Sequence, residues 1–190
     1  TPAYSVSVGG TPIDWATLTY EQIPEADNDD WNDVTCNWNS DGYRLPTWSE
    51  WCWAAIGAYQ DAFAKFQGGV AIKNGVNRVG FLKDVAGYAM DYEIDRDIYA
   101  VNATSQTSPV GTKKANELGL YDMTGNVEEY CWDAPAAFSG PIVDYRGDPN
   151  ETRRVRVGGS WYILNPTITL QDPTMPYFRE NTVGFRVMRP

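Results

Sequence analysis

Residues 108–133 read SPVGTKKANELGLYDMTGNVEEYCWD, a stretch in which turn-forming residues alternate with aromatic ones. Gly119 and Gly125 permit tight turns, because glycine adopts backbone conformations that other residues avoid. Large side chains that can fill a core accompany these turns, namely Leu120, Tyr121 and Trp132. The stretch therefore predicts short strands joined by tight turns.

Upstream of this stretch, the clearest helix signal begins at Pro46-Thr47. Thr47 and Glu50 match a capping box, in which the hydroxyl and the carboxylate each accept a hydrogen bond from a free backbone N–H. Apolar residues then recur at helical spacing until Gly68-Gly69 ends the pattern: Trp51, Ala55, Ala58, Ala62 and Phe66. The pattern predicts a helix over 47–66.

Downstream of it, two strand-like runs flank a polar middle rich in Pro and Thr: RRVRVGGSW at 153–161 and VGFRVMRP at 183–190. We expect the helix face of Trp51, Ala55 and Ala58 to pack against a small twisted sheet that contains 153–159 and 184–188. Few helices and many short strands indicate an α+β chain rather than a doubly wound sheet.

The N-terminal part also carries local signals. The alternating run from Tyr4, followed by Gly9-Gly10, predicts a hairpin. Residues 25–41 are acidic with interleaved aromatics and predict a short helix that leads into a loop. Residues 70–108 predict irregular structure with one or two short strands or helical turns. At 190 residues, the chain fits one domain over 1–190.

Composition excludes several classes of function. The net charge of −10 disfavours binding to nucleic acids or anionic membranes, because such binding needs clustered Lys and Arg. The sequence contains no run of about 18 apolar residues, the length needed to span a bilayer. Histidine is absent, which removes the commonest general base and transition-metal ligand. The three cysteines lack the spacing of a zinc site, and we expect buried thiols with at most one disulfide.

Four phrases, in this order and spacing, resemble the formylglycine-generating-enzyme and sulfatase-modifying-factor family: residues 36–55, 108–133, 153–161 and 176–190. The resemblance implies a variant of the C-type lectin fold with little regular secondary structure. Residues 66–107 match this family poorly and are interpreted as an insertion, and the segment before Cys36 is shorter than usual. For Arg44 and Arg186 within these phrases, we expect structural ion pairs or stacking on aromatic rings.

The phrase around Gly125 also predicts a metal site. Asp122 and Glu129 are carboxylates on one loop that can converge on a hard cation such as calcium. The family resemblance implies calcium bound by four residues, through two side chains and two carbonyls: Asp122, Gly125, Val127 and Glu129. The alternative is that Asp122 caps a turn and Glu129 accepts hydrogen bonds from backbone amides without a metal.

The resemblance also indicates which chemistry is missing. Family members that oxidise a substrate cysteine use a copper-binding cysteine pair after the GGS phrase, but no cysteine follows Gly158 in this chain. A second branch of the family holds iron through histidines, and the chain has none. Copper needs soft thiolates and non-haem iron needs imidazoles. We therefore expect no copper, no iron and no enzymatic activity.

The segment over 161–182 resembles the variable segment of diversity-generating retroelement proteins. In those proteins the last few dozen residues of a C-type-lectin domain are rewritten by adenine-directed mutagenesis and form the ligand-binding face. The residues expected to bind ligand here are Trp161, Tyr162, Ile163, Leu164, Asn165, Ile168, Leu170, Asp172, Met175, Tyr177 and Phe178. We expect most of these side chains to be exposed, because core positions do not tolerate random substitution. Trp161 and Phe185 at the two ends are expected to carry stability; the alternative is a loop that packs on its own domain.

The resemblance implies a non-enzymatic receptor-recognition domain that binds a protein or glycan on another cell or particle. It would be displayed outside the cell, on a cell surface or a virion, although no targeting signal in the sequence indicates this. One rival is a diverged modifying enzyme of the same family. Another is a calcium-dependent sugar-binding lectin, which the absence of an EPN or QPD tripeptide disfavours.

Overall fold

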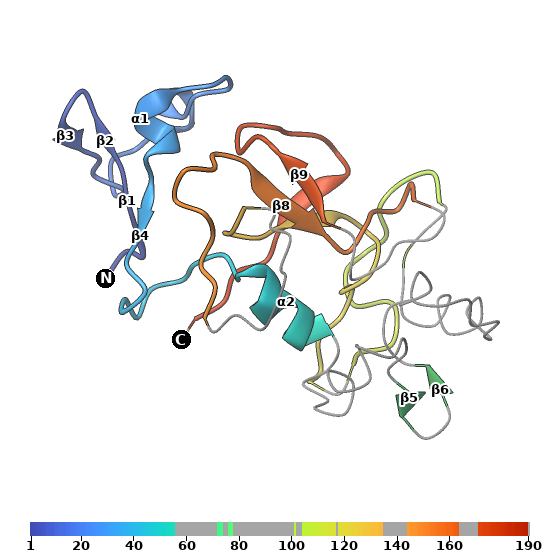
Figure 1. The fold of residues 1–190 in the computed structure, drawn as a ribbon. Helices are drawn as coiled ribbons and strands as arrows, with labels where there is room; N and C mark the ends of the chain where they lie inside the picture. Colours follow the sequence, from blue (N-terminus) through green and yellow to red (C-terminus); the bar gives the residue numbers. More distant parts are fainter. Residues whose placement is uncertain are drawn as a thin grey trace.

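The computed structural model of the chain describes residues 1–55, 101, 104–116, 118–134, 144–163 and 171–189, together with the backbone of two short strands within 72–77. The predicted α+β character is confirmed, because short strands and turns dominate and regular helices are few (Figure 1). Among the described residues, no helix has both the length and the apolar character needed to cross a bilayer.

A four-stranded sheet forms the centre of the fold, with the strand order β10-β7-β8-β9. Its strands are β7 (Glu128–Tyr130), β8 (Arg154–Val157), β9 (Asp172–Thr174) and β10 (Val183–Phe185). β8 pairs antiparallel with both β7 and β9, whereas β10 runs parallel to β7. Both C-terminal runs predicted as strands therefore belong to this one sheet.

The helix α2 (Trp48–Ala55) packs on one face of that sheet. The predicted capping box is confirmed: the Glu50 amide donates to the Thr47 hydroxyl at 3.2 Å, and the Thr47 amide donates to the Glu50 carboxylate at 2.8 Å. A cap of this kind stabilises a helix by about 1 kcal/mol. Residues 56–66 of the predicted helix, including Ala58, lie outside the described residues.

The core lies between α2 and the sheet and contains the side chains of Trp51, Cys52, Ala55, Met123, Cys131, Val155 and Val157. Trp51 is only 1% exposed. Burying one large apolar side chain contributes about 1.5–3 kcal/mol, so this small cluster supplies much of the local stability. The predicted packing of the helix face containing Trp51 and Ala55 against this sheet is confirmed.

The register of the sheet decides which residues face that core. Gly184 pairs with Glu129, and Glu129 pairs with Val157, so these three share the row that faces α2. The next row contains Phe185, Tyr130 and Arg156, and it faces the other way because strand side chains alternate. Phe185 is 70% exposed. The expectation that Phe185 carries core stability is therefore wrong.

The N-terminal segment forms a small unit of its own beside the sheet (Figure 1). β2 (Ser7–Val8) and β3 (Thr11–Pro12) form the predicted hairpin, whose turn residues Gly9 and Gly10 both have positive φ. β1 (Tyr4–Ser5) pairs with β4 (Thr35–Cys36), and between them lie η1 (Tyr20–Gln22) and α1 (Asp29–Asn32). The short helix predicted within 25–41 is therefore present.

The two ends of the chain meet at Asp41. The amine of Thr1 lies 2.9 Å from the Asp41 carboxylate, and the Arg189 Nε donates to the Asp41 carbonyl at 2.9 Å. Within the poorly matched stretch 66–107, β5 (Ile72–Lys73) and β6 (Val76–Asn77) form an antiparallel pair. These are short strands of the kind predicted there.

The two predicted glycine turns are present, with φ of +75° at Gly119 and +80° at Gly125. A Cβ at Gly125 would lie 2.0 Å from the Val101 carbonyl oxygen, so only glycine fits between these chains. No disulfide joins any of the three cysteines, and Cys52 and Cys131 are buried.

Candidate ligand-binding surface

Seven of the eleven predicted ligand-binding residues are described by the structure, and Leu164, Asn165, Ile168 and Leu170 lie outside it. The seven come from two stretches. Trp161, Tyr162 and Ile163 follow the Gly158-Gly159 turn, and Asp172, Met175, Tyr177 and Phe178 lie in β9 and in the loop that follows it. Tyr162 is 75% exposed and the other six are half-buried.

The first stretch is anchored through the backbone of Trp161. Its amide donates to the Asn126 carbonyl at 2.9 Å, and its carbonyl accepts from the Thr104 amide at 2.9 Å. The Trp161 indole meets the Tyr162 ring edge-on, with 5.9 Å between the centroids. The exposure predicted for this segment is therefore confirmed for Tyr162, which projects outward from a held backbone.

The second stretch packs on the outer face of the sheet, opposite α2. The Tyr130 hydroxyl lies 3.1 Å from the carbonyl oxygens of both Met175 and Phe178, and donates its one proton between them. The Arg156 guanidinium lies 4.8 Å from the centre of the Phe178 ring. Met175, Tyr177 and Phe178 are consequently only half-exposed, less than the prediction required.

Arg156 is held between two carboxylates on the same outer face. It pairs with Glu128 at 3.0 Å and with Asp172 of β9, and its side chain is 10% exposed. Burial raises the pKa of Glu128, although the positive charge of Arg156 opposes that effect. Asp172, predicted to bind ligand, thus also has a structural role as a counter-ion.

The two carboxylates of the predicted calcium site, Asp122 and Glu129, have different hydrogen-bond partners. The Asp122 Oδ2 accepts from the Gly111 amide at 2.8 Å, while its Oδ1 is buried and has no hydrogen-bond partner in the described part of the chain. An unpartnered, buried carboxylate oxygen fits a cation ligand. Glu129 instead accepts from the Trp51 indole at 2.7 Å and from Arg186 at 2.8 and 3.0 Å.

Glu129 therefore already has a cationic partner, and its side chain is 8% exposed. The structural ion pair expected for Arg186 is confirmed. The same holds for Arg44, which pairs with Glu50 at 2.6 Å and lies 4.8 Å from the centre of the Trp38 ring. At the predicted calcium site, Asp122 fits the metal, but the carboxylate of Glu129 is already committed to Arg186.

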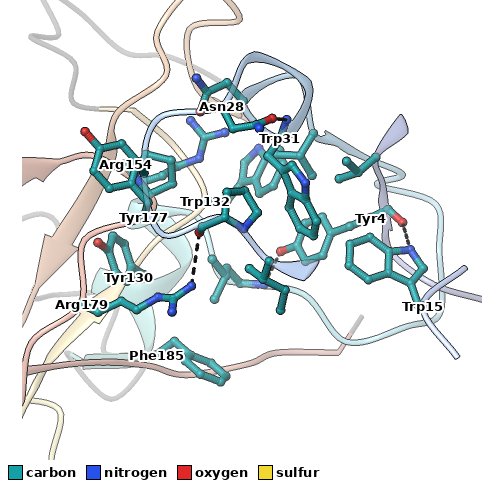
Figure 2. A pocket seen from close by; sticks show the side chains of 18 residues that line it. Tyr4, Trp15, Asn28, Trp31, Tyr130, Trp132, Arg154, Tyr177, Arg179 and Phe185 are labelled. Carbon is teal, nitrogen blue, oxygen red and sulfur yellow. Dashed lines mark hydrogen bonds between the residues drawn. The ribbon is translucent and has the colours of Figure 1, made fainter. Parts of the chain in front are cut away.

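A cavity that the sequence analysis missed lies between the N-terminal segment and the outer face of the sheet (Figure 2). Its volume is about 410 Å³, within the roughly 300–1,000 Å³ typical of small-molecule sites. Seven aromatic residues line it: Tyr4, Trp15, Trp31, Tyr130, Trp132, Tyr177 and Phe185. The only sequence signal for it was the group of aromatics interleaved within residues 25–41.

Four of these rings are ordered by contacts among themselves. Tyr4 stacks on Trp132 with 5.0 Å between centroids, and Trp15 meets Trp31 edge-on at 6.5 Å. The Tyr4 hydroxyl accepts from the Leu45 amide at 2.6 Å, and burial raises its pKa to about 12. The aromatic wall is thus preorganised and uncharged at neutral pH.

The described residues hold no cluster of three or more side chains of the types that ligate metals. Burial raises the pKa of the Cys52 and Cys131 thiols, which makes them poor nucleophiles because the thiolate is the reactive form. Asp133 is 2% exposed, and burial raises its pKa to about 6, while it accepts a hydrogen bond from the Trp48 amide at 2.6 Å. This aspartate caps the start of α2.

The sequence of residues 26–190 matches the sulfatase-modifying factor enzyme 1-like domain. The chain belongs to this family. Its fold is the C-type-lectin-like α+β fold with little regular secondary structure that the resemblance implied.

Relatives of the chain differ in their named activities. It is 37% identical over 162 residues to chaperone protein LppX of Paenibacillus barcinonensis, covering 85% of this chain and 53% of that protein. It is 33% identical over 137 residues to the formylglycine-generating enzyme of Thermomonospora curvata, covering 69% and 42%. The chain thus spans about half the length of the curated relatives that it matches.

Among solved structures, Treponema denticola variable protein 1 is similar over the whole of this chain and 63% of its own length. The TM-score is 0.79 and the sequence identity is 33%.

Proposed function

We propose that this chain is the non-enzymatic ligand-binding domain of a diversity-generating retroelement variable protein, and that it binds through the surface formed by 161–182. The similarity to a protein named variable protein 1 supports this proposal. So does the name of the Paenibacillus relative, which is a chaperone protein rather than an enzyme.

The observation that carries the proposal is the way Tyr130 holds the loop after β9. Its hydroxyl contacts the carbonyl oxygens of Met175 and Phe178, which are main-chain atoms. Every residue type carries a backbone carbonyl, so these contacts survive any substitution at the two positions. The loop can therefore keep its course while its side chains vary.

The Trp161 backbone is held in the same way. Its amide and carbonyl bond to the main chain of Asn126 and Thr104, independently of the neighbouring side chains. Tyr162 then presents a large ring to solvent, and tyrosine gives wide contact area at low entropic cost. A surface built in this way can carry many alternative side chains while its backbone stays in place.

The lack of the metal ligands that the family's enzymes use supports binding over catalysis. No cysteine occurs from Gly158 to Pro190, and the chain has no histidine, so the ligands for copper and for iron in the family's two chemistries are missing. The thiols of Cys52 and Cys131 are buried within the core. Neither is placed to serve as a nucleophile.

We propose that the partner is a protein or glycan on another cell or particle, and that the domain is displayed outside the cell on a cell surface or virion. The net charge of −10 disfavours nucleic acid as the partner. Tyr162 is 75% exposed, and tyrosine is among the residue types enriched at protein interfaces.

Sequencing tests the retroelement origin directly. The proposal expects a neighbouring reverse-transcriptase gene and a near-copy of the segment encoding 155–190. Deep sequencing of the gene from a growing population should show substitutions confined to codons within that segment, at positions where the copy has adenine. Substitutions spread evenly along the gene, with no near-copy, would contradict it.

The second candidate is a diverged modifying enzyme, which the similarity to the Thermomonospora formylglycine-generating enzyme favours. Copper and iron analysis of the purified chain, with a turnover assay on a cysteine-containing peptide, separates the two. The binding proposal expects no stoichiometric copper or iron and no turnover. The enzyme alternative requires one of these metals together with turnover.

Calcium remains a proposal, centred on Asp122 and the carbonyls of Gly125 and Val127. The buried Asp122 Oδ1 without a partner in the described residues supports it. The ion pair between Glu129 and Arg186 argues against Glu129 as a calcium ligand. Calcium would then have a structural role, in ordering the loop.

A further inference from the structure

We propose that the aromatic cavity beside the sheet binds an apolar ring that carries one carboxylate, with Arg154 as the residue that recognises the charge. This proposal rests on the proposed function in one respect, because Pro176, Tyr177 and Arg179 of segment 161–182 form one side of the cavity. The rest of the cavity comes from outside that segment.

The walls of the cavity supply flat apolar surfaces. Trp31 and Trp15 come from the N-terminal segment, and Trp132 follows β7, so rings approach the space from separate parts of the chain (Figure 2). Trp15 is 37% exposed, which leaves its ring accessible from solvent. Aromatic walls favour a planar or cyclic guest through offset and edge-on contacts.

The charges around the cavity have one sign. Both charged residues that line it are arginines, Arg154 and Arg179, and none of the described lining residues is acidic. This is unusual in a chain with 25 acidic and 15 basic residues. An arginine without a direct ion pair in an apolar site attracts an anion, because the low dielectric strengthens the interaction.

Arg154 is the stronger of the two determinants. It stacks over Trp132, with 4.9 Å from the guanidinium carbon to the ring centre, and its NH1 group donates to three main-chain carbonyls. Within the described part of the chain, no carboxylate lies within ion-pair distance of it. Burial lowers its pKa, and the negative charges of Asp133 and Glu151, which act without direct contact, oppose that effect. A bound carboxylate would supply a direct ion-pair partner.

Arg179 differs because it already has partners. It pairs with Glu25 at 3.0 Å and donates to the Tyr20 hydroxyl and the Pro24 carbonyl, which ties the loop after β9 to the N-terminal segment. We therefore assign Arg179 a positioning role, holding the neighbouring Tyr177 and Pro176 in the wall of the cavity.

The polar groups of the cavity argue against a sugar. The Trp15 indole donates to the Tyr4 carbonyl, the Asn32 amide donates to Asp27, and the Asn28 carbonyl oxygen accepts from the Trp31 amide. These three groups are already hydrogen-bonded, so few polar partners remain to replace the hydrogen bonds with water that a hydroxyl-rich guest would lose. One ring with one anionic group matches the site better.

Such a ligand could be a free aromatic acid or the C-terminal aromatic residue of a partner peptide, because both carry a ring beside a carboxylate. The first experiment uses N-acetyl-tryptophan and its neutral amide, which differ in the carboxylate alone. Calorimetric titration of the full chain should give an affinity for the acid at least about tenfold higher than for the amide. Equal affinities, or no binding of either compound, would overturn the proposal.

Variants assign the effect to Arg154. Arg154→Gln should abolish the preference for the acid, whereas Arg154→Lys should retain part of it. Arg153→Gln is the matched control, because this neighbouring arginine is exposed, pairs with Glu151 and does not line the cavity. It should leave the preference unchanged. A preference that survives Arg154→Gln, or is lost equally in both glutamine variants, contradicts the assignment.

The salt dependence of binding keeps the test valid if Arg154→Gln fails to fold. Raising the ionic strength should weaken binding of the acid to the natural chain and leave the amide unaffected. Acid binding that is insensitive to salt would count against recognition by a guanidinium. The peptide source is tested with a hexapeptide ending in tryptophan: tighter binding than N-acetyl-tryptophan indicates a chain terminus, and weaker binding a free acid.

A failure of this inference can be distinguished from a failure of the proposed function. The titrations measure one compound on one sequence and require no sequence diversity in segment 161–182. If adenine-directed variation is confined to the segment but the acid does not bind, the proposed function stands and only this inference is overturned. If the acid binds but no such variation is found, this inference stands and the proposed function is overturned.

Discussion

Arg186, which directly follows β10, pairs with Glu129 of the neighbouring strand β7, with 2.8 Å between guanidinium nitrogen and carboxylate oxygen. The carboxylate is 8% exposed and also accepts from the Trp51 indole in the core. The pair therefore links the C-terminal strand to the centre of the fold.

Replacing Arg186 by glutamine should destabilise the domain by about 3 kcal/mol. Removing one partner of a buried ion pair costs about 3–5 kcal/mol, and Arg186 is 30% exposed, which places it at the lower end. Chemical denaturation measures the change. The exposed pair of Arg146 and Asp144 is the control, and Arg146→Gln should leave the unfolding midpoint almost unchanged.

The double variant Arg186→Gln with Glu129→Gln, compared with each single variant, tests the reason for that cost. Because the loss comes from an uncompensated buried charge, neutralising both partners should recover part of the stability that Arg186→Gln removes. If the double variant is as unstable as the sum of the two single variants, the pair contributes nothing beyond its individual side chains.

Calcium should raise the melting temperature if Asp122 ligates it. A hundredfold excess over the dissociation constant stabilises by about 2.7 kcal/mol, which corresponds to roughly 5–10 °C for a chain of this size. Thermal melts with calcium and with a chelator measure this. Asp122→Ala should abolish the difference, and identical melts of the natural chain in both conditions would remove the metal from the account.

Asp133 should make the domain more stable at mildly acidic pH. Its pKa in the folded state is raised to about 6, above the value of about 3.9 in an unfolded chain, so the folded state binds a proton more tightly. The stabilisation is present below about pH 4 and is lost as the pH rises through 6.

Asp133→Asn tests this pH dependence, because the amide oxygen can still accept the Trp48 N–H at the start of α2. Urea unfolding at pH 4.5 and pH 7.5 should show that the variant gains stability relative to the natural chain at the higher pH. The relative gain is on the order of 3 kcal/mol at most. An equal difference at both pH values would contradict the burial of this carboxylate.

Two aromatic substitutions should have opposite outcomes. Trp51→Ala should cost about 3–5 kcal/mol, because it leaves a cavity in the core. Phe185→Ala should cost less than about 1 kcal/mol, since the ring is 70% exposed. Unfolding midpoints compare them. A large loss of stability in Phe185→Ala would mean that the outer face of the sheet is covered in solution.

The parts of the fold that were predictable from the sequence are those that depend on local patterns. The capping box of Thr47 and Glu50 is contained within four residues, and the turn at Gly9-Gly10 within two, so each could be identified without a partner. The placement of 153–159 beside α2 followed from the family resemblance combined with the spacing of Trp51 and Ala55.

Phe185 shows what local patterns leave open. Alternation in a strand separates two faces but does not say which of them is buried, and that is decided by the register with neighbouring strands. Here Gly184 and Glu129 occupy the row that faces α2, so Phe185 falls on the outer face. The burial of Glu129 is hard to predict from the sequence, because this carboxylate is buried with Arg186 and Trp51 as its hydrogen-bond partners.

The candidate site was predictable only in part for a similar reason. The exposure of Tyr162 follows from its position after a tight turn, but the half-burial of Phe178 depends on Arg156 and on Tyr130, which is 48 residues away. The aromatic cavity joins Trp15 and Trp31 to Tyr177, and no spacing in the sequence relates them.

A display library tests the central claim most directly, by measuring the fraction of folded clones. One library randomises Tyr162, Ile163, Met175, Tyr177 and Phe178, and the matched library randomises five core positions: Trp51, Met123, Cys131, Val155 and Val157. Protease resistance on the display particle measures folding. Because Tyr130 and the Trp161 backbone hold the surface through main-chain atoms, most clones of the first library should fold and few of the second. Equal folded fractions in the two libraries would contradict the claim that 161–182 is a surface built to vary.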